Sequence, residues 1–167
     1  MEDASLERFS IYGFSIDYPP VCWFEFSPKS RREKGDMVIH FPDKEKLFLS
    51  WGDLGTVQKN FQTVKGQADH SIKAMMKSRN VAKVERIVDT SLKINSHEAV
   101  FNQVRFGELS VPLGFGRTKA TKYLACSIHI HCSESARYFV VYAILSPNAP
   151  KDFDELFVRM VKSFTCH

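Results

Sequence analysis

The N-terminal third of the chain alternates between hydrophobic and polar residues with a period of two. Short alternating runs lie on both sides of Gly13 and after Pro20, and further runs follow at 37–41 and 47–51. Successive residues of a strand point to opposite faces of a sheet, and polar segments rich in Gly, Pro and Asp, such as 27–36, form turns. This part of the sequence therefore predicts an antiparallel meander.

Two segments show the three- and four-residue spacing of an amphipathic helix. Between Thr56 and Met76 the apolar residues fall on one stripe, and Thr56 fits the N-cap position. In the C-terminal segment Asp152 and Glu155 fit a capping box, and apolar residues recur on one stripe as far as Phe164. Because each apolar stripe must be covered, we expect both helices to pack on a sheet.

Longer strands are expected in the second half of the chain, at 81–94, 97–106, 123–132 and 137–145. The Gly-containing segment 107–122 is expected to be a connection. The last strand, RYFVVYAIL, is apolar on both faces, which is typical of a central strand with a layer on each side. The predicted fold class is α+β: an α/β/α sandwich in which two main helices cover a mostly antiparallel sheet of about eight strands.

The N-terminal stretch GFSIDYP at 13–19, followed by Trp23, resembles the start of the PsbP-like superfamily. That superfamily includes the extrinsic photosystem II proteins and their Ran-binding relatives. The stretch VKSF at 161–164 and the order of the expected elements resemble the same pattern. The resemblance extends over nearly the whole chain and implies a single PsbP-like domain at 1–167.

The resemblance also implies structural roles and a kind of function. Gly13 and Pro19 would serve turns, whereas Phe14 and Trp23 would serve the core. These proteins bind other macromolecules and are not generally enzymes, so the resemblance implies a non-catalytic binding or assembly module with a protein partner. Fold alone does not name that partner, and the sequence leaves the oligomeric state open.

Composition agrees with one ordinary globular domain. The chain has 167 residues, 44% hydrophobic and 25% charged, and its fourteen Phe predict a core built largely from aromatic side chains. No stretch has the roughly 20 apolar residues of a membrane span, and the acidic N-terminus is unlike a signal peptide. Four cysteines without CxxC spacing favour reduced thiols. We therefore expect a soluble, cytoplasmic protein.

A net charge of +4 gives only a mild attraction to anionic partners. Without a known recognition module, nucleic acid is not an expected ligand, whereas contact with an acidic protein face is the stronger interpretation. The alternative is that the basic loops are simply solvated. Two loops carry the candidate partner-binding residues: Lys29, Arg31, Arg32 and Lys34 in the first, and Arg117, Lys119 and Lys122 in the second.

The stretch CSIHIHC at 126–132 contains the strongest candidate for chemistry. On a strand His129 and His131 share one face, which suits two zinc ligands, while Cys132 points to the other face. Zinc needs a third protein ligand, which a remote histidine or carboxylate would have to supply. The alternative function is therefore a small-ligand or zinc-binding protein that uses the His129 and His131 face. Zinc is the one candidate cofactor, and the simpler interpretation is a two-faced structural strand.

No pattern indicates an enzyme. His131 and Cys132 are neighbours on a strand and face opposite ways, so they cannot act as base and nucleophile. Ser127 and His129 share a face, but no nucleophile elbow accompanies them. The segment around Gly114 lacks the spacing of a phosphate-binding loop.

Overall fold

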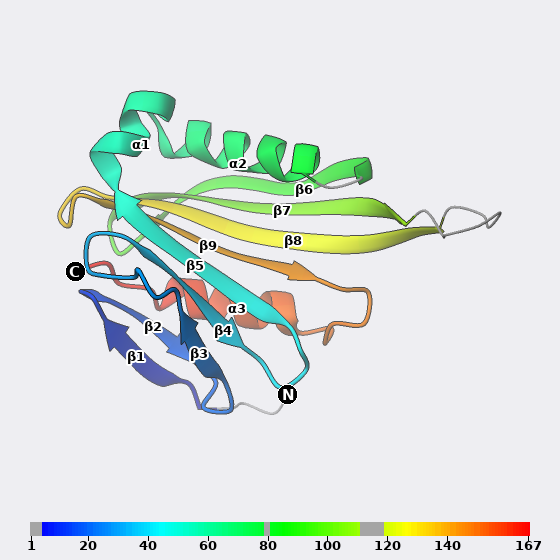
Figure 1. Cartoon of the computed structure of the whole chain (residues 1–167), viewed down its shortest axis with the longest axis horizontal. Helices are drawn as coiled ribbons and strands as arrows, with labels where there is room; N and C mark the ends of the chain where they lie inside the picture. The colour runs from blue at the N-terminus through cyan, green and yellow to red at the C-terminus, as the bar shows by residue number, and fades with distance from the viewer. Residues whose placement is uncertain (1–4, 79–80, 111–118) are drawn as a thin grey trace.

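One large antiparallel sheet forms the centre of the computed structural model, which describes residues 5–78, 81–110 and 119–167 (Figure 1). In the described chain this sheet has seven strands in the order β3-β4-β5-β9-β8-β7-β6. The strands are β3 (Trp23–Phe26), β4 (Gly35–His40), β5 (Lys46–Asp53), β6 (Val81–Ile94), β7 (His97–Ser110), β8 (Lys119–Cys132) and β9 (Arg137–Leu145). The predicted antiparallel sheet and its α+β class are confirmed.

A separate two-stranded hairpin begins the described chain. It consists of β1 (Glu7–Ile11) and β2 (Phe14–Tyr18), joined at Tyr12 and Gly13. The φ angles of these two turn residues are 53° and 72°, in the left-handed region that glycine adopts without steric cost. Two-residue hairpins favour turns with positive φ because their twist matches that of the strands. The turn role expected of Gly13 is confirmed.

Layers lie on both faces of the large sheet (Figure 1). Helix α3 (Phe153–Lys162) and the hairpin pack on one face, where α3 contacts β2 and β8. Helices α1 (Leu54–Phe61) and α2 (Val64–Ser78) lie on the other face, where α2 contacts β7 and β8. The expected α/β/α sandwich is therefore confirmed.

The main core lies between the large sheet, α3 and the hairpin, and aromatic rings dominate it. Phe14, Phe139 and Phe164 are nearly or completely buried, and the ring centroids of Phe139 and Phe164 lie 5.0 Å apart. The expected core role of Phe14 is confirmed, but the one expected of Trp23 is wrong. Trp23 is 56% exposed because β3 is an edge strand, and its ring stacks on His40.

The helices differ from the sequence-based expectation at their ends. The helix expected from Thr56 is two helices, interrupted at Gln62, whose φ is 59°. Its N-cap is Asp53, whose Oδ2 accepts a hydrogen bond from the Thr56 N–H at 2.6 Å. Asp152 sits at the N-cap of α3 but makes no capping hydrogen bond through its side chain, so the expected capping box does not form.

Strands β7 and β8 are longer than expected. Strand β7 continues to Ser110, and β8 already begins at Lys119. Both strands therefore enter the segment 107–122, which was expected to be a connection. Pairing between the strands extends the ladder past Gly107, which pairs with Lys122. Cross-strand pairing thus outweighs the weak strand preference of glycine. Gly114, at the centre of the excluded phosphate-loop pattern, lies outside the described residues.

Candidate functional site

Helix α2 covers only part of its face of the sheet. It packs on β7 through Val64, Ala68 and Val100, which form a small buried cluster. On β9 every second residue, from Arg137 to Leu145, is buried, whereas the residues between them are only half-buried. The two-faced pattern of β9 predicted a layer on each side, and the second layer is incomplete along this strand.

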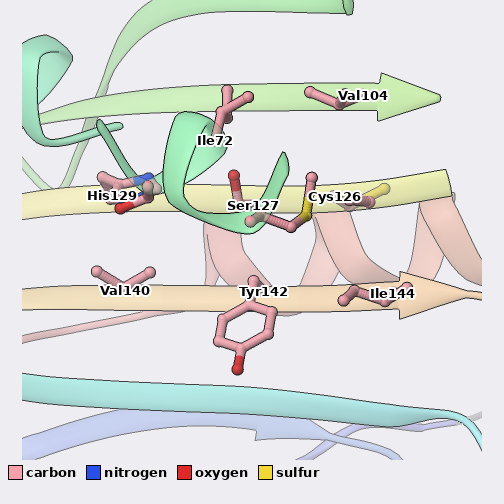
Figure 2. A pocket seen from close by; sticks show the side chains of 11 residues that line it. Ile72, Val104, Cys126, Ser127, His129, Val140, Tyr142 and Ile144 are labelled. Atoms are coloured by element: carbon pink, nitrogen blue, oxygen red, sulfur yellow. The ribbon is translucent and has the colours of Figure 1, made fainter. Parts of the chain in front are cut away.

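The incomplete layer leaves a groove between α2 and the sheet (Figure 2). Its cavity volume is about 370 Å³, and most of its lining is apolar. In Figure 2 the side chains of β8 and β9 line the groove along one stretch of sheet, with α2 crossing beside them. The described lining residues are Ser71, Ile72 and Met75 of α2, Val104 of β7, Ala125, Cys126, Ser127 and His129 of β8, and Val140, Tyr142 and Ile144 of β9.

His129 and His131 both lie under α2, on the face predicted for them. His129 Nε2 lies 3.1 Å from Ser71 Oγ, and His131 Nε2 lies 2.8 Å from Gln67 Oε1. The Ser71 hydroxyl donates its proton to the backbone carbonyl oxygen of Gln67, at 3.0 Å. Since a hydroxyl has one proton, Nε2 of His129 must be the donor to Ser71 Oγ. Likewise the acceptor Gln67 Oε1 requires a proton on Nε2 of His131.

The predicted metal site at His129 and His131 is not supported. Both Nε2 atoms are engaged with α2, so only the two Nδ1 atoms could bind a metal. In the described part of the chain no third histidine, cysteine or carboxylate completes a ligand group with this pair. The simpler interpretation of a two-faced strand fits these residues, because their hydrogen bonds fasten the helix to the sheet.

Burial and, to a smaller extent, the nearby His131 together lower the pKa of His129 to about 4. His129 is therefore neutral near pH 7, and among the described groups no partner bonds its Nδ1. Without an acceptor to orient the imidazole, and with Nε2 already protonated, His129 cannot act as a general base on Ser71. The contact between Ser71 and His129 is thus not a catalytic dyad.

Burial also raises the pKa of the Cys126 thiol to about 11, although a hydrogen bond from Gln103 acts in the opposite direction. The thiolate is the nucleophilic form of cysteine, and at neutral pH Cys126 stays a thiol. Cys126 is also fully buried in the main core, so its thiol is not presented to the groove. The apolar walls and the neutral His129 suit binding rather than nucleophilic chemistry.

The two basic loops lie at opposite ends of β8. The first loop lies next to Arg137, because the Arg137 guanidinium donates a hydrogen bond to the backbone carbonyl of Arg32. Arg137 in turn pairs with Cys132, the last residue of β8. Lys119 starts the same strand, thirteen residues earlier, which is roughly 40 Å along a strand. The loops therefore cannot form one surface. Lys122 is exposed, and Arg117 lies outside the described residues.

The first loop is exposed but is not a patch of one charge. Lys29, Arg31, Arg32 and Lys34 are all exposed, and Arg31 lies 3.7 Å from Glu33. Arg32 also lines a shallow polar cavity of about 370 Å³. The other charged residues that line it are Glu33, Asp53, Glu134 and Arg137. The three carboxylates reduce the attraction of this end of the molecule for an anion.

The sequence did not point to the groove itself. Ser71, Ile72 and Met75 belong to the helical stripe and its flank, and Tyr142 and Ile144 belong to the two-faced strand. Each pattern is typical of core residues. Only the position of α2 across the sheet shows that these side chains border a cavity, and no local sequence signal encodes that position.

Comparison with solved structures supports the PsbP-like fold. Cyanobacterial PsbP from Synechocystis sp. PCC 6803 superposes with a TM-score of 0.61 at 13% identity, over 98% of this chain and 94% of the other. The Ran-binding protein Mog1p of Saccharomyces cerevisiae gives a TM-score of 0.60 at 11% identity, over 98% and 96%. At these identities the likeness shows the fold alone.

Sequence comparisons give no closer relationship. No family model matches the chain, and no curated protein matches it by sequence. Across the described segments, no helix combines the length and the apolar character that crossing a bilayer demands. The resemblance to the PsbP-like proteins is therefore one of fold, shared with PsbP and with Mog1p.

Proposed function

We propose that the protein is a non-catalytic binding module that holds an apolar segment of a protein partner in the groove beside α2. The observation that carries this proposal is the cavity of about 370 Å³ with mostly apolar walls. Apolar surface left open on a folded protein is a common mark of an interaction site. Mog1p, which shares the fold, is described as Ran-binding, so the fold is compatible with a protein partner.

The walls of the groove favour a peptide segment as its occupant. Ile72 and Met75 lie on the helix side, and Val140, Tyr142 and Ile144 lie on the strand side. A helix or extended peptide that inserts one or two apolar side chains between these walls would bury them at little polar cost. The partner's chemistry is thus an exposed apolar anchor in an otherwise polar segment.

One pair of neighbouring methionines tests this proposal. Met75 lines the groove, whereas Met76 is 38% exposed and is not among the lining residues. Met75→Glu and Met76→Glu make the same chemical change in the same helix. We expect wild type and Met76→Glu to capture one and the same protein from a lysate of the source organism, and Met75→Glu to lose it while melting at a similar temperature. Equal capture by both variants would rule out the groove as the docking site.

A small ligand in the same groove is the second candidate function. It is favoured by His129, whose buried Nδ1 has no hydrogen-bond partner among the described groups and could accept a bond from a ligand. Native mass spectrometry of the purified protein distinguishes this candidate. A reproducible added mass that disappears in Met75→Glu indicates a ligand, and an unmodified mass leaves the protein partner as the better function.

The first basic loop remains a proposed second contact. Its exposed side chains would meet acidic residues at the edge of a partner and would affect the rate of association more than the affinity. The second loop lies at the other end of β8 and is not part of that contact.

A further inference from the structure

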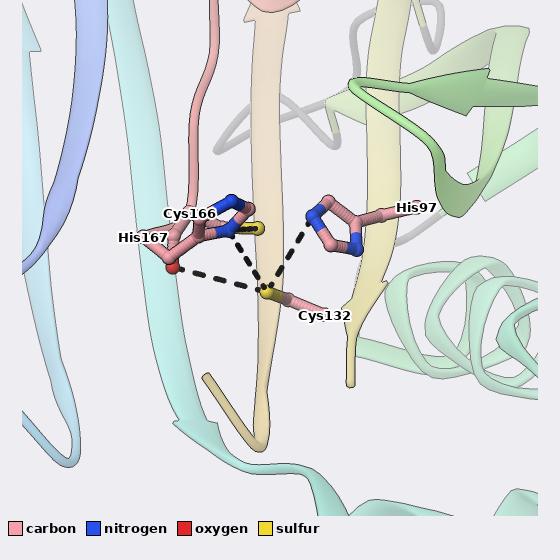
Figure 3. Close-up of side chains that lie close together, drawn as sticks. All are labelled: His97, Cys132, Cys166 and His167. Carbon is pink, nitrogen blue, oxygen red and sulfur yellow. Dashed lines mark hydrogen bonds between the residues drawn. The ribbon is translucent and has the colours of Figure 1, made fainter. Parts of the chain in front are cut away.

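Four side chains of types that can bind metals lie close together at the end of the sheet opposite to Lys119 (Figure 3). They are His97, Cys132, Cys166 and His167, and one nitrogen or sulfur atom from each lies within 4.8 Å of the other three. The first three residues are buried and His167 is exposed. The group is separate from the groove beside α2, because Cys132 points to the other face of β8 from His129 and His131.

Three separate segments bring these residues together. His97 begins β7 and Cys132 ends the neighbouring strand β8, so antiparallel pairing places them side by side. Cys166 and His167 follow α3 in a segment that Thr165 ties to β2 by two hydrogen bonds with Ser15. In Figure 3 the rings of His97 and His167 approach the Cys132 sulfur from opposite sides.

The distances between these donor atoms are close to those of a tetrahedral site. Cys132 Sγ lies 3.9 Å from His97 Nε2 and 4.0 Å from His167 Nδ1, and Cys166 Sγ lies 3.7 Å from His167 Nδ1. Zinc bonds of about 2.3 Å to sulfur and 2.05 Å to nitrogen put sulfur and nitrogen about 3.6 Å apart in a tetrahedron. For these three pairs a contraction of a few tenths of an ångström would reach that spacing, and all the other donor pairs lie within 4.8 Å.

Groups around the four residues fit the outer shell of a metal site. Glu134 Oε2 lies 3.1 Å from His167 Nε2, the nitrogen that does not face the sulfurs. A carboxylate in this position holds a ligating imidazole in the required tautomer. The Ser135 N–H donates to Cys132 Sγ at 3.4 Å, which stabilises negative charge on the sulfur. Arg137 supplies a buried positive charge that bonds the Cys166 carbonyl oxygen.

We propose that His97, Cys132, Cys166 and His167 bind one zinc ion. Two thiolates and two imidazoles form the tetrahedral donor set that is typical of zinc, and four protein ligands leave no open position for a substrate. The site is therefore structural: it fastens the segment after α3 to the ends of β7 and β8. Cysteine binds zinc as the thiolate, so zinc displaces any proton held by the two cysteines.

Zinc titration of the untagged protein under reducing conditions tests this proposal. The protein competes for zinc with a chromogenic chelator, and cobalt titration reports the ligand geometry. Wild type is expected to bind one equivalent and to give a tetrahedral cobalt spectrum with thiolate charge-transfer absorption. Cys22→Ser, which changes a cysteine outside the group, is the matched control and should behave like wild type.

The ligand variants make the result specific. Cys166→Ser should lose the charge-transfer band in part, and the exposed His167→Gln should abolish stoichiometric binding without affecting the fold. Glu134→Gln, which removes only the outer-shell carboxylate, should weaken zinc binding about 10- to 100-fold. Zinc should raise the melting temperature of wild type and not that of His167→Gln. Three results would each overturn the proposal. They are wild-type protein that fails to compete for zinc, unchanged zinc binding in His167→Gln, and a disulfide between Cys132 and Cys166 that persists in reductant.

Discussion

Arg137 Nη2 donates a hydrogen bond to the carbonyl oxygen of Cys166 at 3.1 Å, and so joins strand β9 to the segment after α3. The same guanidinium bonds three more backbone carbonyls, those of Tyr12, Gly13 and Arg32. Arg137 is only 5% exposed. One buried cation thus connects the hairpin turn, the first basic loop and the C-terminal segment to the sheet.

Replacing Arg137 should be among the most destabilising single changes. Arg137→Ala leaves four carbonyl groups without their donor, and hydrogen bonds to a charged group contribute about 1.5–3 kcal/mol each but are not additive. We expect the free energy of unfolding to fall by about 3 kcal/mol or more. Arg137→Lys should recover only part of this loss, because an ammonium cannot reproduce the guanidinium fork.

Urea unfolding measures these changes, and Arg105→Ala is the matched control. Arg105 is exposed and lies 3.4 Å from Glu85, so its removal should cost less than about 1 kcal/mol. Equal losses for the two alanine variants would contradict the role assigned to Arg137.

Two aromatic residues of the N-terminal motif should respond very differently to truncation. Phe14 is 2% exposed and packs against the rings of Trp51, Phe139 and Phe164, so Phe14→Ala should lower the free energy of unfolding by about 3–5 kcal/mol. Trp23 is 56% exposed, and Trp23→Ala should cost less than about 1 kcal/mol. Chemical denaturation of both variants checks this, and a larger loss for Trp23→Ala would show that the edge strand depends on its stack with His40.

Much of the fold could be predicted from local patterns. The hydrophobic stripe of α3, the turn at Gly13 and the alternation of β4 and β5 each follow from the backbone geometry of one element. Helix ends were less predictable, because Asp53 ends a strand and caps a helix at once. The exposure of Trp23 depends on strand order, which places β3 at an edge.

The two candidate sites depend on tertiary arrangement and were harder to predict. Alternation correctly placed His129 and His131 on one face and Cys132 on the other. It could not show that Gln67 and Ser71 of α2 would use the imidazole nitrogens. Nor could it show that Cys132 would meet residues 34 or more positions away in the chain, because the register of β7 on β8 and the path after α3 bring them together.

The first basic loop should affect association without affecting stability. Arg31 is exposed, and its pairing with Glu33 at 3.7 Å is solvent-screened, so Arg31→Glu should change the free energy of unfolding by less than about 0.5 kcal/mol. If the loop meets an acidic edge of the partner, this variant should capture less partner at low salt, and the difference should shrink at high salt. Lys162→Glu, which makes the same charge change on α3, is the control. Equal capture by both variants at low salt would show that the loop is only solvated.

The neutral state of His129 should make stability depend on pH. Its pKa is about 4 in the folded protein, lowered by burial and by His131, against about 6.5 in an unfolded chain. Between these values the unfolded state binds the extra proton, so the free energy of unfolding should fall as the pH falls from about 6.5 to about 4. The loss from this residue alone should approach about 3 kcal/mol.

His129→Gln isolates this contribution, because glutamine does not titrate and can still donate to Ser71. Urea unfolding at several pH values between 4.5 and 7.5 should give a steep slope for wild type and a shallower one for the variant. Carboxylates with lowered pKa values, such as Asp53 and Asp89, lose their contribution only below about pH 4, so they do not produce this slope. Parallel slopes for wild type and variant would mean that His129 titrates over the same pH range in the folded and unfolded protein. The imidazole would then be accessible to protonation, which would contradict its assignment as a buried neutral donor to Ser71.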